Sequence, residues 1–166
     1  MRSNELLQID EKDMQVKRIW TFAVSNGKRE NNRHFLNEDV IDDNTMLALF
    51  HGKSKHRFEI WKITRTGNSF KVKEAAATNG DLVSNSSQVQ GFTYNVAHKC
   101  YYIAFNDYLF KIDAKGNLVN YYHFNAKPEV EGLASYKSKI YIAINKRAEV
   151  FDSNMAKQPQ EQALKK

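Results

Sequence analysis

Two groups of residues have side chains that could do chemistry, and each must be weighed against a structural role. Cys100 with any of five histidines could supply a nucleophile and its base. A free cysteine is ordinarily a small buried hydrophobe, however, and a repeat described below places Lys139 where Cys100 stands. His51 and His56 have no third ligand at a spacing typical of zinc sites. We therefore expect no catalytic residue here and no metal bound by these histidines.

The acidic segment NEDVIDDN at residues 37–44 could bind calcium, because it clusters carboxylates. It lacks the alternating Asp/Asn loop with a central glycine that calcium-binding loops use, so the pattern favours a solvated strand and turn. No glycine-rich phosphate loop leads from a strand into a helix. The sequence thus predicts no cofactor.

A sequence repeat is most evident in two stretches, YYIAFNDYLFKID at 101–113 and IYIAINKRAEVFD at 140–152. Upstream of each stands a matching VQGF (89–92) or VEGL (130–133). The segments are short, rich in Tyr, Ile, Val and Phe, and separated by turn residues, which favours strands over helices. Each unit therefore predicts a strand, an apolar second strand, a hairpin and a third strand.

Two further copies lie nearer the N-terminus. KITRTGN (62–68) matches KIDAKGN (111–117), and MLALF (46–50) stands where the YIAF strand belongs. QIDEKDMQV (8–16) matches KIDAKGNLV (111–119), so this copy begins at its third strand. In the turns of these copies we expect Gly67 and Gly116 to adopt positive φ, with Asp13 in the place of glycine.

Four strands per unit at a period of about 40 to 50 residues is typical of β-propeller blades. The middle strands are apolar on both faces, as a blade between two neighbours requires. We predict an all-β, propeller-like domain of about three and a half four-stranded blades, an incomplete or open ring, in preference to a β-sandwich. The predicted parts are one domain over 1–152, a partial blade at 6–24, blades at about 38–80, 88–124 and 129–152, and a polar tail at 153–166.

One polar set recurs at the start of three of these units: Glu38, Gln90 and Glu131. On the inner strands of a propeller these side chains could line a central channel and bind a ligand. Alternatively, they could form hydrogen bonds with the neighbouring blade, where buried polar groups need partners. We favour the blade-contact role and keep the channel as the alternative. An open ring also leaves sheet edges unpaired, so we expect self-association through them.

The composition is that of a folded soluble domain, with 42% hydrophobic and 27% charged residues. The formal net charge of +6 favours an anionic partner such as an acidic cell-wall polymer or a lipid surface, although scattered basic residues also occur on ordinary soluble surfaces. The densest basic stretch, GKSKHRF at 52–58, lacks the interleaved aromatics of single-strand binders. We therefore expect no nucleic-acid partner.

Three blocks in one order resemble the helveticin J family of large heat-labile bacteriocins: LALFHGKSKHRFEIWKI (47–63), SQVQGFTYNVAHKCYYIAFND (87–107) and EVEGLASYKSKIYIAIN (129–145). The resemblance spans about residues 40–150 and corresponds to the C-terminal half of that family. It implies a secreted protein that inhibits related bacteria at their cell surface. The family has no known catalytic chemistry, and its members often lack a conventional leader peptide.

These observations predict a helveticin-like, non-enzymatic bacteriocin or a fragment of one, with the bacterial cell envelope or another protein as its partner. The start, MRSNELLQIDEKDMQ, has no basic segment followed by an apolar one, so we expect secretion without a conventional signal peptide, or else a cytoplasmic location. The N-terminal half of the family is missing, which suggests a truncated reading frame or one part of a split protein. The alternatives are a generic propeller interaction module and, more remotely, a hydrolase built on a propeller face.

Overall fold

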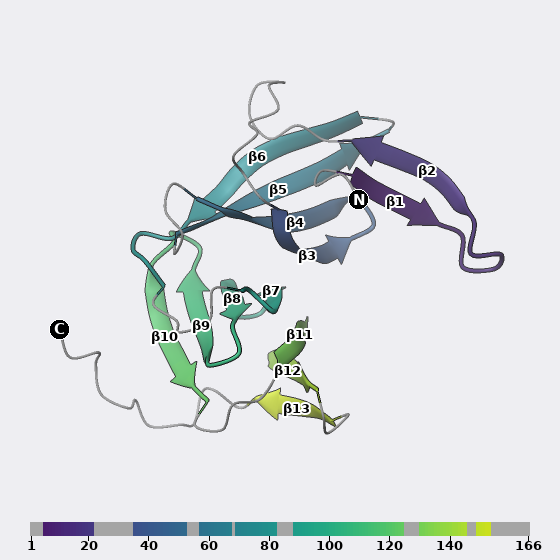
Figure 1. Cartoon of the computed structure of the whole chain (residues 1–166). Coiled ribbons are helices and arrows are strands. Elements are labelled where there is room, and N and C mark those ends of the chain that lie inside the picture. Colours follow the sequence, from purple (N-terminus) through teal and green to yellow (C-terminus); the bar gives the residue numbers. More distant parts are fainter. Residues whose placement is uncertain are drawn as a thin grey trace.

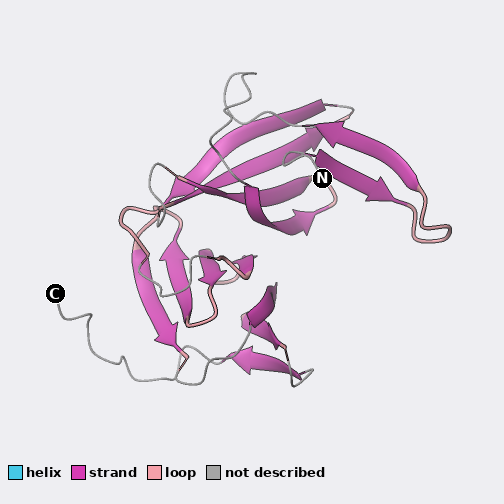
Figure 2. Ribbon diagram, in the orientation of Figure 1, coloured by secondary structure: helices cyan, strands magenta, loops and turns pink. Residues whose placement is uncertain are grey.

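The computed structural model describes residues 5–21, 35–52, 57–67, 69–82, 88–124, 130–145 and 149–153. Within these ranges all regular secondary structure is β-strand (Figure 2). The strands form four separate antiparallel sheets. Nowhere in these ranges does a helix occur that is long and apolar enough to cross a membrane.

Each sheet is a meander, in which strands that follow one another in the chain also pair (Figure 1). The first sheet is a hairpin of β1 (Glu5–Ile9) and β2 (Val16–Thr21). The second contains β3 (Phe35–Asp42), β4 (Thr45–His51), β5 (Phe58–Thr66) and β6 (Ser69–Ala77). The third contains β7 (Gly91–Asn95), β8 (Cys100–Ala104), β9 (Tyr108–Asp113) and β10 (Leu118–His123), and the fourth contains β11 (Val130–Tyr136), β12 (Lys139–Ile144) and β13 (Glu149–Ser153).

These sheets confirm the predicted all-β, propeller-like architecture. The second sheet spans 35–77, where a blade was expected at 38–80, the third spans 91–123, where one was expected at 88–124, and the fourth spans 130–153, where one was expected at 129–152. The sheets follow one another around an arc with β3, β7 and β11 in successive contact, which makes these the inner strands (Figure 1). The described strands do not close this arc into a ring. A β-sandwich, with two sheets facing one another, would not place the sheets in this succession.

The sheets are held together by apolar side chains that alternate along the middle strands. On β8, Tyr101 and Ile103 face the second sheet, in a core that also contains Phe105, Leu49 and Ile60. The alternate β8 side chains face the fourth sheet, in a core made by Cys100, Tyr102, Ala104, Leu109, Val130, Ile140 and Ile142. The third sheet is thus buried on both faces, as the apolar pattern of its middle strand predicted.

The inner strands of the third and fourth sheets approach so closely that a side chain would not fit between them. A Cβ atom on Gly91 of β7 would lie 2.8 Å from the backbone nitrogen of Leu133 on β11 and 3.0 Å from the carbonyl carbon of Gly132. This contact explains why the VQGF motif carries glycine at its third position.

The turn glycines have the backbone conformation that the sequence predicted: φ is 59° at Gly67 and 89° at Gly116. The prediction for the first hairpin was wrong, because Met14, with φ of 55°, takes the left-handed position instead of Asp13. The turn after β1 is one residue longer than the turn after β9. The Met14 N–H reaches back four residues to the Asp10 carbonyl, whereas the Gly116 N–H reaches back three, to Asp113.

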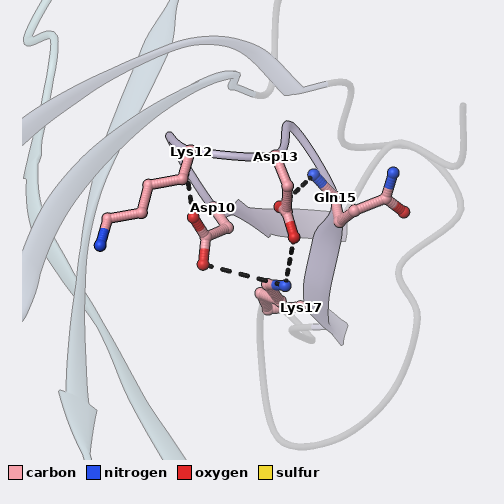
Figure 3. A network of polar contacts seen from close by, with 5 residues as sticks. All are labelled: Asp10, Lys12, Asp13, Gln15 and Lys17. Carbon is pink, nitrogen blue, oxygen red and sulfur yellow. Dashed lines mark hydrogen bonds and ion pairs between the residues drawn. The ribbon is translucent and has the colours of Figure 1, made fainter.

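Asp13 instead stabilises that turn with its side chain (Figure 3). Its carboxylate accepts a hydrogen bond from the backbone N–H of Gln15 at 2.9 Å and pairs with the Lys17 ammonium at 2.8 Å. The hydrogen bond from Lys17, followed by that from Gln15, holds the pKa of the Asp13 carboxyl below its usual value. Asp10 caps the same turn by accepting from the Lys12 N–H.

Candidate functional site

The structure places the predicted polar set on the inner strands or beside them, but not at one shared register position. Gly91 lies opposite Ala104 and Gly132 lies opposite Ala143, so Gln90 and Glu131 each precede the residue that faces the repeated alanine. In the second sheet Phe50 corresponds to Phe105 of the third sheet. By the strand register, Asn37 then occupies the position that Gly91 and Gly132 have in their sheets. Glu38 follows that residue instead of preceding it.

The surroundings of the three side chains also differ. Glu38 is exposed, but the surrounding protein partly desolvates its carboxyl and so raises the pKa of that group. Gln90 is half-buried and donates its backbone N–H to the carbonyl of Ala104. Glu131 is exposed, beside an irregularity in the β11–β12 ladder. The channel and blade-contact roles of this set stay predictions.

A blade contact of the expected kind is made by Asp39, the neighbour of Glu38. One carboxylate oxygen of Asp39 on β3 accepts from the Thr93 hydroxyl at 3.0 Å and from the Tyr94 N–H at 2.7 Å, both on β7. Burial raises the pKa of the Asp39 carboxyl, and the hydrogen bonds from Tyr94 and Thr93 offset this only in part. Asp39 therefore joins the inner strands of the second and third sheets.

Replacing Asp39 with alanine should lower the free energy of unfolding by about 2–4 kcal/mol, because the Thr93 hydroxyl and the Tyr94 N–H lose their acceptor. Asp39→Asn keeps an oxygen acceptor and should cost less. Because the folded-state pKa is raised, the folded protein binds this proton more tightly than the unfolded chain does. The stability gained from this tighter proton binding is therefore present at low pH. It is lost as the pH rises through the pKa that the Asp39 carboxyl has in the folded protein. Urea unfolding at neutral and acidic pH measures both effects, and equal losses in the Ala and Asn variants would contradict this role.

The strongest candidate for a binding surface lies where two hairpin turns meet, the β7–β8 turn and the β11–β12 turn. Asn95, whose side chain is fully buried, connects them. Its amide oxygen accepts from the His98 N–H in its own turn at 2.9 Å. Its amide nitrogen donates to the carbonyls of Lys137 at 3.0 Å and Lys139 at 3.4 Å in the neighbouring turn. A second bond, from the Ser135 hydroxyl to the Tyr94 carbonyl at 2.8 Å, fixes the same junction.

This junction gathers four exposed basic side chains, which we call the basic turn cluster: His98, Lys99, Lys137 and Lys139. Exposed apolar surface adjoins it, because Val96 is 63% exposed and so is Tyr136. The ammonium group of Lys137 lies 5.2 Å from the centre of the Tyr136 ring. The corresponding turn of the second sheet, between β3 and β4, carries the acidic residues Asp42 and Asp43 instead. The positive charge at this end is therefore concentrated on the third and fourth sheets.

Lys99 and Lys137 share an uncommon backbone conformation, with φ of 52° and 55°. The left-handed region is disfavoured for residues other than Gly, Asn and Asp, and such residues often occur at functional positions. In the described ranges only one other non-glycine residue, Met14, has positive φ. Lysine here thus costs some stability, and it places an ammonium group on each of two adjoining turns.

Within the described part of the chain, the remaining sequence candidates do not assemble into another site. Cys100 is buried, as expected for a small hydrophobe, and its thiol contacts the His98 carbonyl at 3.2 Å. In the part of the chain that the structure describes, no group of three or more His, Cys, Asp and Glu side chains could hold a metal ion. Residues 53–56 of the basic stretch and the tail from residue 154 onward lie outside the described residues.

Sequence reasoning missed the basic turn cluster because no single stretch contains it. HK at 98–99 and KSK at 137–139 are short, and each resembles an ordinary solvated turn. The available signal was their repeat position, since each segment joins the first two strands of its unit. Asn95 gave no comparable signal, because an asparagine before a turn is common and its burial depends on the neighbouring sheet.

Comparison with known proteins adds little to this description. No family model matches the chain, and no curated protein matches it. Among solved structures, the β-propeller domain of Nup133 from Vanderwaltozyma polyspora is similar over 72% of this chain, with 16% sequence identity and a TM-score of 0.40. The chain spans 38% of the length of that structure.

Proposed function

We propose that this chain is a non-enzymatic, helveticin-like antibacterial protein, or a piece of one, that is secreted and binds the anionic envelope of related bacteria. The observation that carries the proposal is the basic turn cluster, in which a buried asparagine holds two lysine-bearing turns together. The formal net charge of +6 also supports the proposal, because it attracts the protein to a negatively charged surface.

The resemblance to the bacteriocin family and the cluster involve the same residues. The β7–β8 turn lies in the block at 87–107, and the β11–β12 turn lies in the block at 129–145. The exposed ring of Tyr136 beside Lys137 offers an apolar face next to the charge. Such a surface suits a flexible polyanion whose phosphates meet the ammonium groups while its apolar parts pack on the ring.

Neutralising two lysines of the cluster should weaken binding to cells about thirtyfold. The variant Lys99→Asn/Lys137→Asn removes two charges, and asparagine tolerates the left-handed backbone at both positions. A lysine near an anionic surface contributes about 1 kcal/mol, so two contribute about 2 kcal/mol. The measurement is a co-sedimentation titration with cells of a susceptible strain, which should also show weaker binding at higher salt.

The control variant is Lys71→Gln/Lys73→Gln, which removes the same charge from exposed positions on β6. It should bind nearly as the unaltered protein does. Equal losses in both variants would mean that net charge, and not the cluster, determines binding.

Growth inhibition of related bacteria tests the antibacterial part of the proposal. Purified, folded protein is expected to inhibit growth, and the Lys99→Asn/Lys137→Asn variant should be weaker in proportion to its loss of binding. Folded protein that binds cells without inhibiting them would favour a simple interaction module. Folded protein that neither binds nor inhibits would contradict the proposal.

A further inference from the structure

The chain just beyond β6 contains an asparagine that is followed directly by a glycine, Asn79–Gly80. In such a pair the backbone nitrogen of the glycine can attack the side-chain amide of the asparagine, because glycine has no Cβ atom to hinder the approach. Both residues are exposed and belong to no strand. A Cβ atom on Gly80 would meet nothing within 4 Å, so the backbone has room to move here. The pair therefore has the surroundings that this reaction needs.

The side chain of Asn79 nevertheless has a structural role, because it connects the second sheet to the third. Its amide nitrogen donates to the side-chain oxygen of Asn117 at 2.6 Å and to the carbonyl of Lys115 at 3.2 Å, in the turn between β9 and β10. The backbone N–H of Asn79 also donates to the Gly116 carbonyl at 2.9 Å. Both side-chain bonds require a hydrogen-bond donor at residue 79.

A carboxylate determines the direction of these hydrogen bonds. The Asn117 side-chain nitrogen donates to one oxygen of Asp113 at 2.9 Å, and the other oxygen accepts the N–H groups of Lys115 at 2.8 Å and Asn117 at 2.9 Å. The bond from the Asn117 side chain is the main reason that the pKa of the Asp113 carboxyl lies below its usual value. An ionised carboxylate only accepts, so Asn117 must turn its nitrogen to Asp113 and its oxygen to Asn79.

The same bonds decide when the reaction can occur. While Asn117 and Lys115 hold the Asn79 amide, its carbonyl carbon is not free to rotate towards the Gly80 nitrogen. Attack therefore follows an opening of this junction, and local openings of that kind are frequent near exposed turns. Each opening that ends in reaction is irreversible, so the junction has a finite lifetime.

We propose that Asn79 is a site of spontaneous deamidation, and that the reaction breaks the polar junction between the second and third sheets. The Gly80 nitrogen bonds to the side-chain carbonyl carbon of Asn79, while the amide nitrogen leaves that carbon as ammonia and carries the proton that Gly80 loses. Water then opens the resulting succinimide at either carbonyl carbon and gives aspartate or isoaspartate. This inference does not depend on the proposed binding to cells.

Either product puts a carboxylate where the junction requires a donor. Its oxygens have no hydrogen to give to the Asn117 side chain or to the Lys115 carbonyl, and they would face those oxygens instead. Asn117 cannot turn over to supply the missing donor, because its oxygen would then face the Asp113 carboxylate. Two hydrogen bonds between the sheets are therefore lost together.

Peptide mapping by mass spectrometry, on the full chain incubated at mildly alkaline pH, tests the reaction. Aspartate and isoaspartate should accumulate at residue 79, and Gly80→Ala should remove this signal without unfolding the protein, because its Cβ atom meets nothing within 4 Å. A second Asn–Gly pair, at 26–27, serves as the reference that the reaction has run. An Asn79 that stays intact after that pair has reacted would overturn the proposal.

Opening the junction should speed the reaction. Gly116→Ala places a Cβ atom against the Ala77 carbonyl oxygen and pushes the β9–β10 turn away from β6, so Asn79 should react faster than in the unaltered protein. Gly67→Ala, whose Cβ atom would meet nothing within 4 Å, should leave the rate unchanged. Equal rates in these two variants would contradict the role of the junction.

The variant Asn79→Asp tests the consequence without the reaction. It should move the unfolding equilibrium towards the unfolded state by about thirtyfold, the effect of two lost hydrogen bonds. In an Asp113→Asn background the loss should be much smaller, because residue 113 can then donate to the Asn117 oxygen while the Asn117 nitrogen donates to residue 79. Equal losses in the two backgrounds, measured by urea unfolding, would refute the proposed effect on the junction.

Discussion

Replacing Gly116 with alanine is expected to lower the free energy of unfolding by about 3–5 kcal/mol, from backbone strain and lost hydrogen bonds together. Gly116 has φ of 89°, a conformation that costs alanine roughly 1–2 kcal/mol. Its new Cβ atom would also overlap the carbonyl oxygen of Ala77, at the end of β6 in the preceding sheet. The β9–β10 turn would have to move away from β6.

That movement breaks a polar junction between the two outer strands. The Asn79 N–H donates to the Gly116 carbonyl at 2.9 Å, and the Asn79 amide donates to the Asn117 side chain at 2.6 Å and to the Lys115 carbonyl at 3.2 Å. Each hydrogen bond contributes about 1 kcal/mol, so losing two or three accounts for most of the effect. Urea unfolding followed by tryptophan fluorescence measures it.

Gly67→Ala is the matched control. Gly67 also has positive φ, 59°, but a Cβ atom there would meet nothing within 4 Å. The control should lose only the conformational part, about 1 kcal/mol. If both variants lost the same amount, strain alone would explain the result and the contact with Ala77 would be unimportant.

Phe105→Ala should be comparably severe, at about 3–5 kcal/mol, because it empties the core between the second and third sheets. Phe105 is 1% exposed and makes edge-on contacts with Phe58 and Phe110, at ring-centre distances of 5.9 and 5.8 Å. These three rings come from both sheets, so the cavity would weaken the contact between blades as well as one sheet. Domains of this size are typically stable by only 5–15 kcal/mol, and the variant should melt well below the unaltered protein.

Val119→Ala serves as the comparison for Phe105, because Val119 is 50% exposed on the outer strand β10. It should change stability by no more than about 0.5 kcal/mol. If the Phe105→Ala protein melted at the same temperature as the Val119→Ala protein, the stability of the two sheets would not depend on this core.

The fold could be predicted from the sequence to the level of blades because the same pattern of strands and turns occurs several times in the chain. YIAF and YIAI mark the buried second strands, and the glycines at 67 and 116 mark the turns that follow the third strands. In the first hairpin, where the repeat is weaker, the predicted position of the residue with positive φ was wrong by one residue. EKDM was aligned on AKGN letter by letter, but the first turn contains one more residue, so Met14 and not Asp13 has positive φ.

The candidate site could not be predicted in the same way, because it depends on contacts between sheets. The recurrence of Glu38, Gln90 and Glu131 in the sequence suggested equivalence, yet in the strand ladders Glu38 follows the residue position that Gln90 and Glu131 precede. Asp39, which does join two blades, stands beside Glu38 with nothing in its type to distinguish it. Local patterns report which face of a strand a residue occupies, but not which residue of another blade it meets.

The buried amide of Asn95 has a consequence for the affinity that the proposed binding of an anionic chain would have. Because Asn95 binds backbone atoms in both turns, the Cα positions of Lys99 and Lys137 are set before any ligand arrives. Only the side chains remain to be ordered on binding, and the entropic penalty is smaller than for two independent loops. Asn95 thus fixes the distance between the two turns through backbone atoms, while the ammonium groups keep the freedom of their side chains.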